Sequence, residues 1–118
     1  VLLAKTLVLA AIEGWPTVAL GSLAENPFPD ATPEFFASLA RIASEGLRAP
    51  LAVVAPFRGL TKADVVRRGR DLPLALTLSC ARPTPAERHC GTCSKCRERI
   101  EAFARAGVPD ATAYAAGR

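Results

Sequence analysis

The stretch TVALGSLAENPFPDATPEFFASLARIASEGLRAPLAVVA, residues 17–55, contains two apolar segments that flank a helical pattern. Residues 17–21 (TVALG) and 51–55 (LAVVA) are short continuous apolar runs, which is typical of strands buried on both faces of a parallel sheet. Between them, Thr32 can cap a helix over residues 33–46 whose first residue is a proline. The order of strand, helix and strand predicts a parallel unit of an α/β sheet.

Further helices are predicted on both sides of this unit. Residues 1–14 are apolar in almost every direction, which is the pattern of a helix buried on more than one side. Thr61 and Asp64 form a capping-box pattern for a helix that runs to about Asp71, and a last helix is predicted over residues 94–106. The side chains predicted to face the core from the helices over 33–46 and 94–106 are Phe35, Phe36, Leu39, Ile100, Phe103 and Ala104.

Two strands cannot form an open α/β sheet by themselves, because both faces of a parallel sheet must be covered. The helix over residues 1–14 also needs partners on more than one side. We therefore expect the chain to be the C-terminal portion of a larger α/β domain. Residues 1–76 would form half of a nucleotide-binding domain, and residues 77–118 would form a four-cysteine loop and helix.

Four cysteines near the C-terminus follow the pattern C-x9-C-x2-C-x2-C. They are Cys80, Cys90, Cys93 and Cys96. Three thiolates within seven residues, with a fourth brought in by a loop, can surround one tetrahedral thiophilic ion at roughly 2.3 Å per bond. The spacing therefore favours a structural zinc site.

Other interpretations of the cysteines stay open at this point. An iron–sulfur cluster is the strongest rival, because C-x2-C-x2-C opens the bacterial ferredoxin run, although Ile100 and Glu101 stand where that run has its fourth cysteine and a proline. Disulfides or free thiols are the others. A redox C-x-x-C motif fits less well, because it needs only two cysteines and leaves Cys80 and a third thiol unexplained. His89 is a possible substitute ligand, but with four thiolates available we expect it beside the site or at the surface.

The composition is that of one globular domain, with 118 residues, half of them apolar, and a formal net charge of +4. Basic side chains concentrate in the C-terminal half, where they either form a solvated surface or attract RNA and nucleotide phosphates. They are Arg67, Arg68, Arg70, Arg82, Arg88, Lys95, Arg97, Arg99 and Arg105. Binding of nucleic acid is therefore an open alternative, and charge alone does not decide it.

The apolar opening of the chain, residues 1–12, is too short to cross a bilayer and carries Lys5 in its middle rather than in a basic leader. We expect a cytoplasmic protein with no membrane partner, in which reduced thiols can hold a metal. A homodimer is compatible with the sequence.

The loops after the two predicted strands are the expected place for a binding site, because ligands of open parallel sheets bind outside the carboxyl ends of the strands. Residues 22–32 form a long loop with Asp30, which could hydrogen-bond a polar heterocycle or simply organise the turn. Residues 56–62 end with Lys62 at a helix start, a favourable setting for phosphate. The sequence shows no catalytic triad and no glycine-rich phosphate loop, so these residues alone do not encode a complete nucleotide enzyme.

The cysteine run carries a family resemblance. The pattern S-C-x9-C-G-x-C-x-x-C-x-x-R followed by A-F, from Ser79 to Phe103, resembles the C-terminal zinc region of the 7-cyano-7-deazaguanine synthase family, the queuosine-pathway branch of the PP-loop superfamily. Residues 28–35 (FPDATPEF) are similar to the substrate loop of that family, and residues 60–66 (LTKADVV) to the start of its next helix. The cysteine pattern is specific, and the other two stretches support it.

The resemblance implies a Rossmann-like, adenine-nucleotide-hydrolase-like parallel sheet with a zinc-bound helical segment. It also implies a reaction in which ATP, with magnesium, activates 7-carboxy-7-deazaguanine as an adenylate, and ammonia then leads through an amide to the nitrile. By the same resemblance, Asp30 and Glu34 match the substrate loop, and Lys62 a position near the nucleotide. The four cysteines match the zinc ligands.

This sequence also departs from the family pattern. The S-G-G-x-D-S loop that holds the ATP phosphates is absent from these residues. In the loop before the second helix, Asn26 replaces the usual acid, Ala31 the usual cysteine and Thr32 the usual arginine. A paralogue that acts on another carboxylate, or a zinc-stabilised module that binds RNA or nucleotides, is therefore an alternative.

Overall fold

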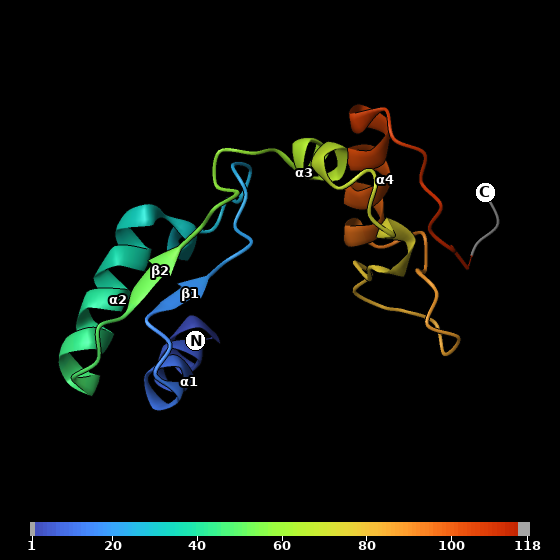
Figure 1. Ribbon diagram of the computed structural model, residues 1–118. Coiled ribbons are helices and arrows are strands. Elements are labelled where there is room, and N and C mark those ends of the chain that lie inside the picture. Colours follow the sequence, from blue (N-terminus) through green and yellow to red (C-terminus); the bar gives the residue numbers. More distant parts are fainter. Residues whose placement is uncertain (1, 116–118) are drawn as a thin grey trace. The chain divides into compact units, whose positions relative to one another are not determined.

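The computed structural model describes residues 2–115 (Figure 1). The chain divides into two compact units, residues 1–59 and residues 60–118. The predicted division at residue 76 grouped residues 60–76 with the strands. In the structure, α3 (Lys62–Arg68) packs against α4 (Ser94–Ala106), so the compact unit that holds the cysteines begins earlier than the predicted segment.

The first unit contains a parallel two-stranded sheet of β1 (Thr17–Ala19) and β2 (Ala52–Val54), in which Val18 lies opposite Val53. Both predicted strands are present and run parallel, and each has three residues rather than the predicted five. Successive side chains of a strand face opposite sides, and Val18 and Val53 are the ones that join the apolar core. The side chains on the opposite face of the sheet are exposed: Thr17, Ala19, Ala52 and Val54.

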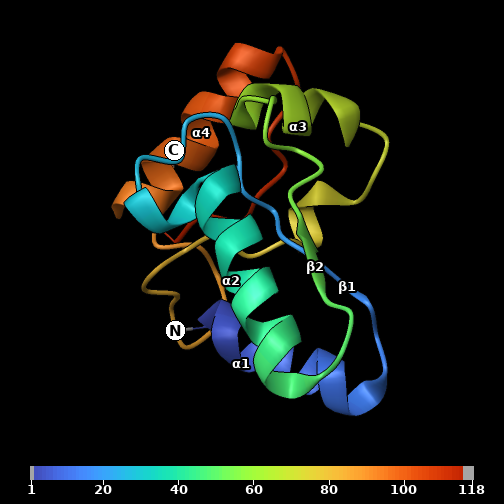
Figure 2. The same cartoon turned by 90° about the vertical axis from the view of Figure 1, so that its left-hand side faces the viewer.

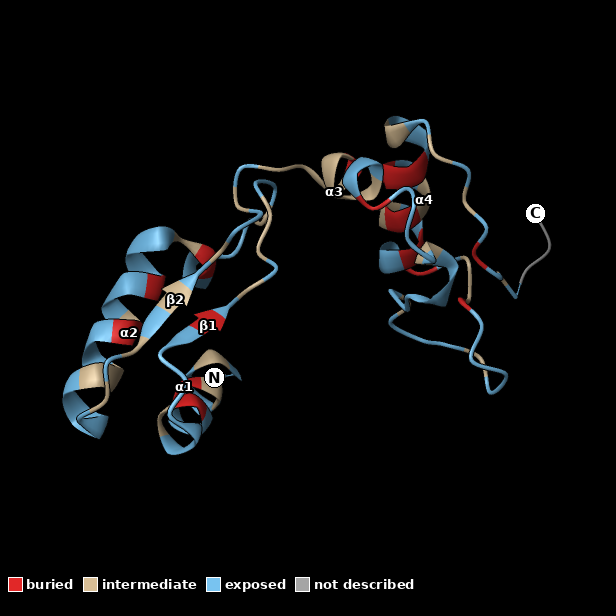
Figure 3. Ribbon diagram, viewed as in Figure 1, coloured by how far each residue is buried: buried red, intermediate tan, exposed pale blue. Residues whose placement is uncertain are grey.

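Two helices, α1 (Leu2–Glu13) and α2 (Pro33–Leu47), pack against each other beside the sheet (Figure 2). Leu7 and Ala10 of α1 are buried in the core, and the buried residues of α2 lie on its side toward β2 (Figure 3). The apolar residues on the rest of α1 are exposed: Leu2, Val8, Leu9 and Ile12. The structure therefore buries one side of α1, and the sequence pattern had predicted burial on more than one.

The start of α2 follows the sequence prediction. The Thr32 hydroxyl oxygen accepts a hydrogen bond from the Phe35 backbone N–H at 3.1 Å, and a proline occupies the first helical position. Of the predicted core residues, Phe36 is buried and Leu39 is half-buried, whereas Phe35 is 40% exposed because it lies on the outer side of the first turn. The helix ends after Leu47, at Arg48, which has a left-handed backbone with φ 51°.

In the second unit, the capping box of α3 is present: Thr61 accepts from the Asp64 N–H, and Asp64 accepts from the Thr61 N–H. Helix α4 has the predicted bounds, with Gly107 as a left-handed cap. The buried residues of α4 are Cys96, Arg99, Ala102 and Phe103. Of the residues predicted to face the core from α4, Phe103 is buried, Ile100 is half-buried and Ala104 is exposed. The buried side of the helix is the one that contains Cys96 and the residues three and seven positions after it.

Two short 3-10 helices complete the described chain, η1 (Pro29–Ala31) before α2 and η2 (Leu74–Leu76) after α3. Over residues 2–115, no helix combines the length and the hydropathy that a membrane crossing requires.

The left-handed residue at the end of α2 gives a test of this fold. Arg48→Gly should stabilise the protein by about 0.5 to 1 kcal/mol, because glycine adopts a positive φ without the strain that a Cβ atom causes. Urea unfolding midpoints of the two proteins measure the change. Arg48→Ala is the matched control, since it removes the same side chain and keeps the Cβ. Equal gains from both substitutions would show that the strain is not the cause.

Candidate metal centre and strand-end loops

The four cysteine sulfurs converge on one point in the second unit. Their Sγ atoms all lie within 4.8 Å of one another, although Cys80 is ten residues from the next cysteine. The Sγ atoms of Cys80 and Cys93 are 3.9 Å apart, and those of Cys90 and Cys96 are 4.0 Å apart. A tetrahedron of 2.3 Å metal–sulfur bonds has edges of roughly 3.8 Å. The arrangement therefore fits one tetrahedral ion.

A disulfide interpretation does not fit the same distances. All four cysteines are free, and the two Sγ–Sγ separations are about twice the roughly 2.05 Å length of a disulfide bond. The donor set of four sulfurs is soft, which suits zinc or iron rather than magnesium or calcium. The residues present thus fit the metal that the sequence pattern predicts, and they could hold it without any further ligand.

Backbone N–H groups around the sulfurs support negative charge on them. Cys93 is the N-cap of α4, and its Sγ accepts the Cys96 N–H at 3.4 Å. The Sγ of Cys90 accepts the Cys93 N–H at 3.4 Å, and the Sγ of Cys80 accepts N–H groups of Arg82 and Cys90, both at 3.3 Å. Thiolates bind metals, whereas thiols do not. This local backbone therefore prepares the site for a cation.

The four thiols do not share one protonation behaviour. Hydrogen bonds from the backbone of Thr92 and Cys93 lower the pKa of Cys90 to about 5. The backbone N–H of Ala81 likewise lowers the pKa of Cys93. Burial has the opposite effect on Cys96, whose pKa rises to about 12. Without a metal, Cys96 keeps its proton at neutral pH, and a bound cation would have to displace it.

His89 is buried beside the sulfur cluster and does not lie at the surface, which was the other position expected for it. Its Nε2 accepts the backbone N–H of Ser79 at 3.0 Å, and its ring packs edge-on against Tyr114 with centroids 5.7 Å apart. The backbone N–H of His89 donates to the Ala113 carbonyl oxygen, and its carbonyl oxygen accepts the Ala115 N–H. Burial is the main cause that lowers its pKa. His89 thus joins the residue before Cys80 to the C-terminal segment.

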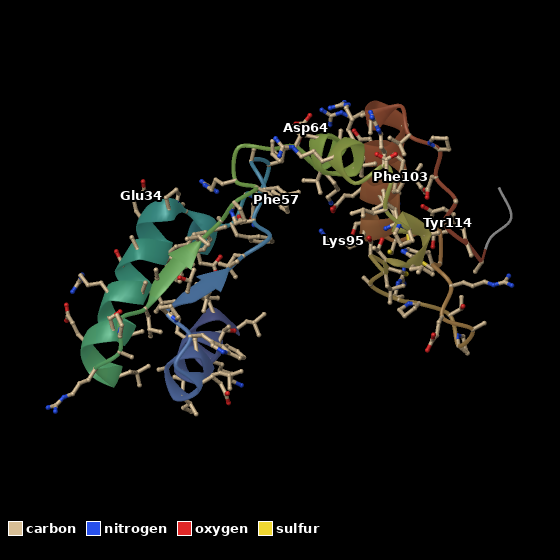
Figure 4. All side chains as sticks on the ribbon, viewed as in Figure 1. Glu34, Phe57, Asp64, Lys95, Phe103 and Tyr114 are labelled. Carbon is tan, nitrogen blue, oxygen red and sulfur yellow. The ribbon has the colours of Figure 1, made fainter. Side chains whose placement is uncertain are left out.

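Arg99 is a residue that sequence reasoning missed as part of this region, because it was counted among surface charges. It is only 7% exposed, and it donates hydrogen bonds to Leu74, Thr77, Ser79 and Thr112. The signal for its burial was its spacing, since it follows Cys96 by three residues and so lies on the same side of α4. The region around Phe103 and Tyr114 appears in Figure 4.

The predicted substrate residues Asp30 and Glu34 lie in the first unit. Asp30 is in η1 and Glu34 is in the first turn of α2, and both are exposed. Figure 4 labels Glu34. The two strand-end loops are joined here, because the Arg58 guanidinium donates to the Ala31 carbonyl oxygen at 2.7 Å. The loop after β2 thus holds the short helix that carries Asp30.

The three positions that depart from the family pattern all have local structural roles. Asn26 accepts the Phe28 N–H at 3.1 Å and so organises the turn before η1. Ala31 is buried, and Thr32 caps α2. These residues therefore shape the loop, and the side-chain oxygen atoms of Asn26 and Thr32 already accept backbone N–H groups.

Lys62, the predicted nucleotide-binding residue, lies in the second unit at the first position of α3. Its ammonium group forms an ion pair with Glu98 of α4, and this pair is the largest cause that lowers the pKa of Glu98. Lys95 also pairs with Glu98 at 2.8 Å. In this structure Lys62 thus ties α3 to α4.

Comparison with known proteins agrees with the resemblance seen in the sequence. Residues 1–107 match the family described as "Queuosine biosynthesis protein QueC". A 7-cyano-7-deazaguanine synthase of Methanothrix thermoacetophila is 40% identical over 97% of this chain and 53% of its own length. The enzymes of that name from Xanthomonas oryzae pv. oryzae and Syntrophotalea carbinolica are 40% and 34% identical, each over 94% of this chain. The chain spans about half the length of the curated relatives it matches.

Loss of one thiolate should release the metal and loosen the start of α4. In Cys93→Ala we expect metal content to fall from one ion per chain toward zero and helical circular dichroism to decrease, because a structural metal supplies folding energy directly. Cys93→Ser keeps an oxygen that can cap the helix, so it separates loss of the metal from loss of the cap. Ser94→Ala is the control, and unchanged metal content in Cys93→Ala would contradict the assignment.

Binding of Zn²⁺ at pH 7 should release fewer than four protons, because Cys90 with its pKa of about 5 is already a thiolate while Cys96 with its pKa of about 12 is not. As the pH falls toward 5, Cys90 takes up a proton and the number released should rise. Calorimetric titrations in buffers of different ionisation enthalpy measure this number. Release of four protons at pH 7 would show that the backbone N–H groups do not lower the pKa of Cys90.

Proposed function

Because this chain belongs to the 7-cyano-7-deazaguanine synthase (QueC) family of queuosine biosynthesis, we propose that it is the substrate-loop and metal-bearing half of an ATP-dependent enzyme. That enzyme would convert 7-carboxy-7-deazaguanine and ammonia to 7-cyano-7-deazaguanine through an adenylated carboxylate. The half that binds the ATP phosphates would come from outside these 118 residues. The observation that carries the proposal is the family match over residues 1–107 together with an incomplete sheet.

The outer edge of β1 has unpaired backbone groups and the outer edge of β2 is partly closed, which supports a further strand of the proposed larger domain beside β1. The Pro16 carbonyl oxygen accepts the Ala52 N–H, and the Leu20 N–H donates to the Val54 carbonyl oxygen. Backbone groups of a strand point alternately to its two sides, so those of Thr17 and Ala19 point away from β2, to the outer edge of β1. Among the described residues, no hydrogen bond satisfies those groups. Unpaired backbone groups at a sheet edge are a template for another strand.

The outer edge of β2 is partly closed by its own neighbourhood. The Ser44 hydroxyl accepts the Leu51 N–H at 3.0 Å and donates to the Leu51 carbonyl at 3.2 Å. The Ala55 carbonyl accepts the Arg58 N–H at 3.1 Å. A further strand would therefore pair with β1. The handedness of parallel crossovers agrees with this. Helices α1 and α2 cover the same face of the sheet, so a right-handed connection through α1 would come from a strand on the side of β1 opposite to β2.

This arrangement supports a role for the loop of residues 20–32 at the active site. Ligands bind beyond the carboxyl ends of parallel strands, and the loop leaves β1 at that end, next to the open edge. The exposed carboxylates of Asp30 and Glu34 can accept hydrogen bonds from ring N–H and amino groups of a deazapurine. Arg58 would position Asp30 through Ala31, and Lys62 would act near the nucleotide only after it leaves Glu98.

The metal would take no part in the reaction. Zinc bound by four thiolates has no open position for a substrate, so when bound it supplies folding energy to the second unit. The four-sulfur geometry supports this structural role.

Asn26, Ala31 and Thr32 favour one alternative, which is a related enzyme that acts on another carboxylate. The oxygen atoms of two of these side chains already accept backbone N–H groups and the third side chain is buried, so the loop offers a ligand different groups from the family's acid, cysteine and arginine. An RNA-binding module has less support. Several of the basic side chains counted from the sequence pair within the second unit, among them Arg67 with Asp64 and Lys95 with Glu98.

The proposal is tested with the protein that joins this chain to its upstream segment or to a copurifying ATP-binding subunit. Formation of AMP and pyrophosphate should require 7-carboxy-7-deazaguanine and ammonia. Asp30→Asn and Glu34→Gln should each raise the KM for the carboxylate on the order of tenfold, since a hydrogen bond to a charged group contributes about 1.5 kcal/mol or more.

Glu45→Gln is the matched control, because Glu45 is exposed on the same helix roughly 16 Å from Glu34. It should leave the KM unchanged. Turnover of a different carboxylate in place of the deazaguanine would favour the related enzyme. An upstream sequence without an ATP-phosphate loop, combined with no AMP formation, would remove the enzyme proposal.

A further inference from the structure

Cys80 is the ligand whose position the other three do not determine. Cys90, Cys93 and Cys96 lie within one turn and the start of α4, so their spacing is set by local backbone. Cys80 arrives from a segment without regular secondary structure, with three residues between it and the end of η2. Its Sγ accepts the N–H groups of Arg82 and Cys90, and the direction from which it approaches them depends on what holds residues 77–79.

Arg99 holds this segment from the helix side. Its Nη1 donates to the hydroxyl oxygens of Thr77 and Ser79 at 2.9 and 3.1 Å, and its Nη2 donates to the Leu74 carbonyl at 2.7 Å. Its Nε donates to Thr112 at 2.8 Å. One planar guanidinium thus joins α4 to η2, to the segment before Cys80 and to the C-terminal segment.

The environment of Arg99 is unusual for a buried cation. All four acceptors are neutral oxygens, and the guanidinium lies 5.0 Å from the centre of the Phe103 ring. Burial of a charge is costly unless its hydrogen bonds are satisfied. Its donors on three different nitrogens are satisfied here, so the residue is built into one defined geometry rather than left in a surface position.

His89 fixes the same segment from the other side. Its Nε2 accepts the Ser79 N–H, so Ser79 is bonded through its backbone to His89 and through its side chain to Arg99. Ser79 is the residue directly before Cys80. A segment held at both its backbone and its side chain leaves the next residue little freedom.

We propose that Arg99 is a positioning residue for the metal centre, which holds residues 77–79 so that the Cys80 sulfur completes the set of four. It does not touch the metal. The helix that carries Cys96 also carries Arg99 on the same side, so α4 supplies one ligand directly and fixes another through its guanidinium. This role is independent of which carboxylate the enzyme uses.

The test uses the full chain loaded with Co²⁺ in place of Zn²⁺, because sulfur-to-cobalt absorption reports how many thiolates bind. Arg99→Lys keeps the charge but cannot place three nitrogens on fixed acceptors. We expect its charge-transfer absorption per bound Co²⁺ to fall by about one quarter, as for loss of one of four thiolates. Its Zn²⁺ affinity should fall on the order of ten- to a hundredfold, the usual effect of removing a residue that orients a ligand.

Four further variants separate this role from general destabilisation. Arg105→Lys, at an exposed arginine in the last turn of the same helix, should retain the wild-type spectrum. Cys80→Ser should lower the absorption as Arg99→Lys does, and the double variant Cys80→Ser/Arg99→Lys should match Cys80→Ser alone, because both act through one sulfur. If Arg99→Lys does not fold, Thr77→Val/Ser79→Ala removes two of the acceptors and should lower the absorption in the same direction.

Each remaining outcome overturns the proposal. Arg99→Lys could give a four-thiolate spectrum and a Zn²⁺ affinity within twofold of wild type, and this result would show that Cys80 needs no positioning. If Arg99→Lys does not fold, the same result in the Thr77→Val/Ser79→Ala variant would show it. Additive losses in the double variant would show that Arg99 acts elsewhere. A wild-type chain that binds no Co²⁺ and no Zn²⁺ would remove the metal centre itself.

Discussion

The convergence of four sulfurs is the interaction on which the second unit depends, because its apolar core is small. Among the described residues of this unit, Phe103 is the one large apolar side chain that is buried. Its other buried apolar residues are Ala63, Ala102 and two of the cysteines themselves. Small domains with so little buried surface are usually stabilised by a metal or by disulfides. The cysteines here are free and converge on one point, so a metal is the stabilising element that the geometry supports.

The first unit meets the same shortage of core in another way. Leu7, Ala10 and Val18 form its core cluster, while large apolar side chains of α1 stay exposed. One face of a parallel sheet is covered by helices and the other is bare, although parallel sheets are normally covered on both. An extra strand at β1 and helices on the bare face would satisfy both needs at once. A metal ion would thus complete the second unit, and the further strand and helices of the proposed larger domain would complete the first.

The sequence predicted those features that depend on local patterns. The helix starts at Thr32 and Thr61, the end of α4 and the parallel strands follow from capping residues and apolar runs, and all are present. The four-cysteine cluster was predictable as well, because three of its members have a spacing that local backbone alone can bring together. Burial was predicted less well. Phe35 and Ala104 lie on helices as expected, but which side of a helix is covered depends on tertiary contacts that periodicity does not specify.

Charge was the least informative property of the sequence, and the reason is physical. A formal count assigns the same positive charge to every arginine, whether it is solvated, paired or buried. In the structure Arg99 donates hydrogen bonds to four neutral oxygens, Lys62 is paired with Glu98, and Arg58 bonds a carbonyl of the neighbouring loop. Each of these cations bonds a segment distant in sequence, by 36 residues in the case of Lys62. The basic residues of this chain are therefore partly structural, and their number overstates the charge available to a nucleic acid.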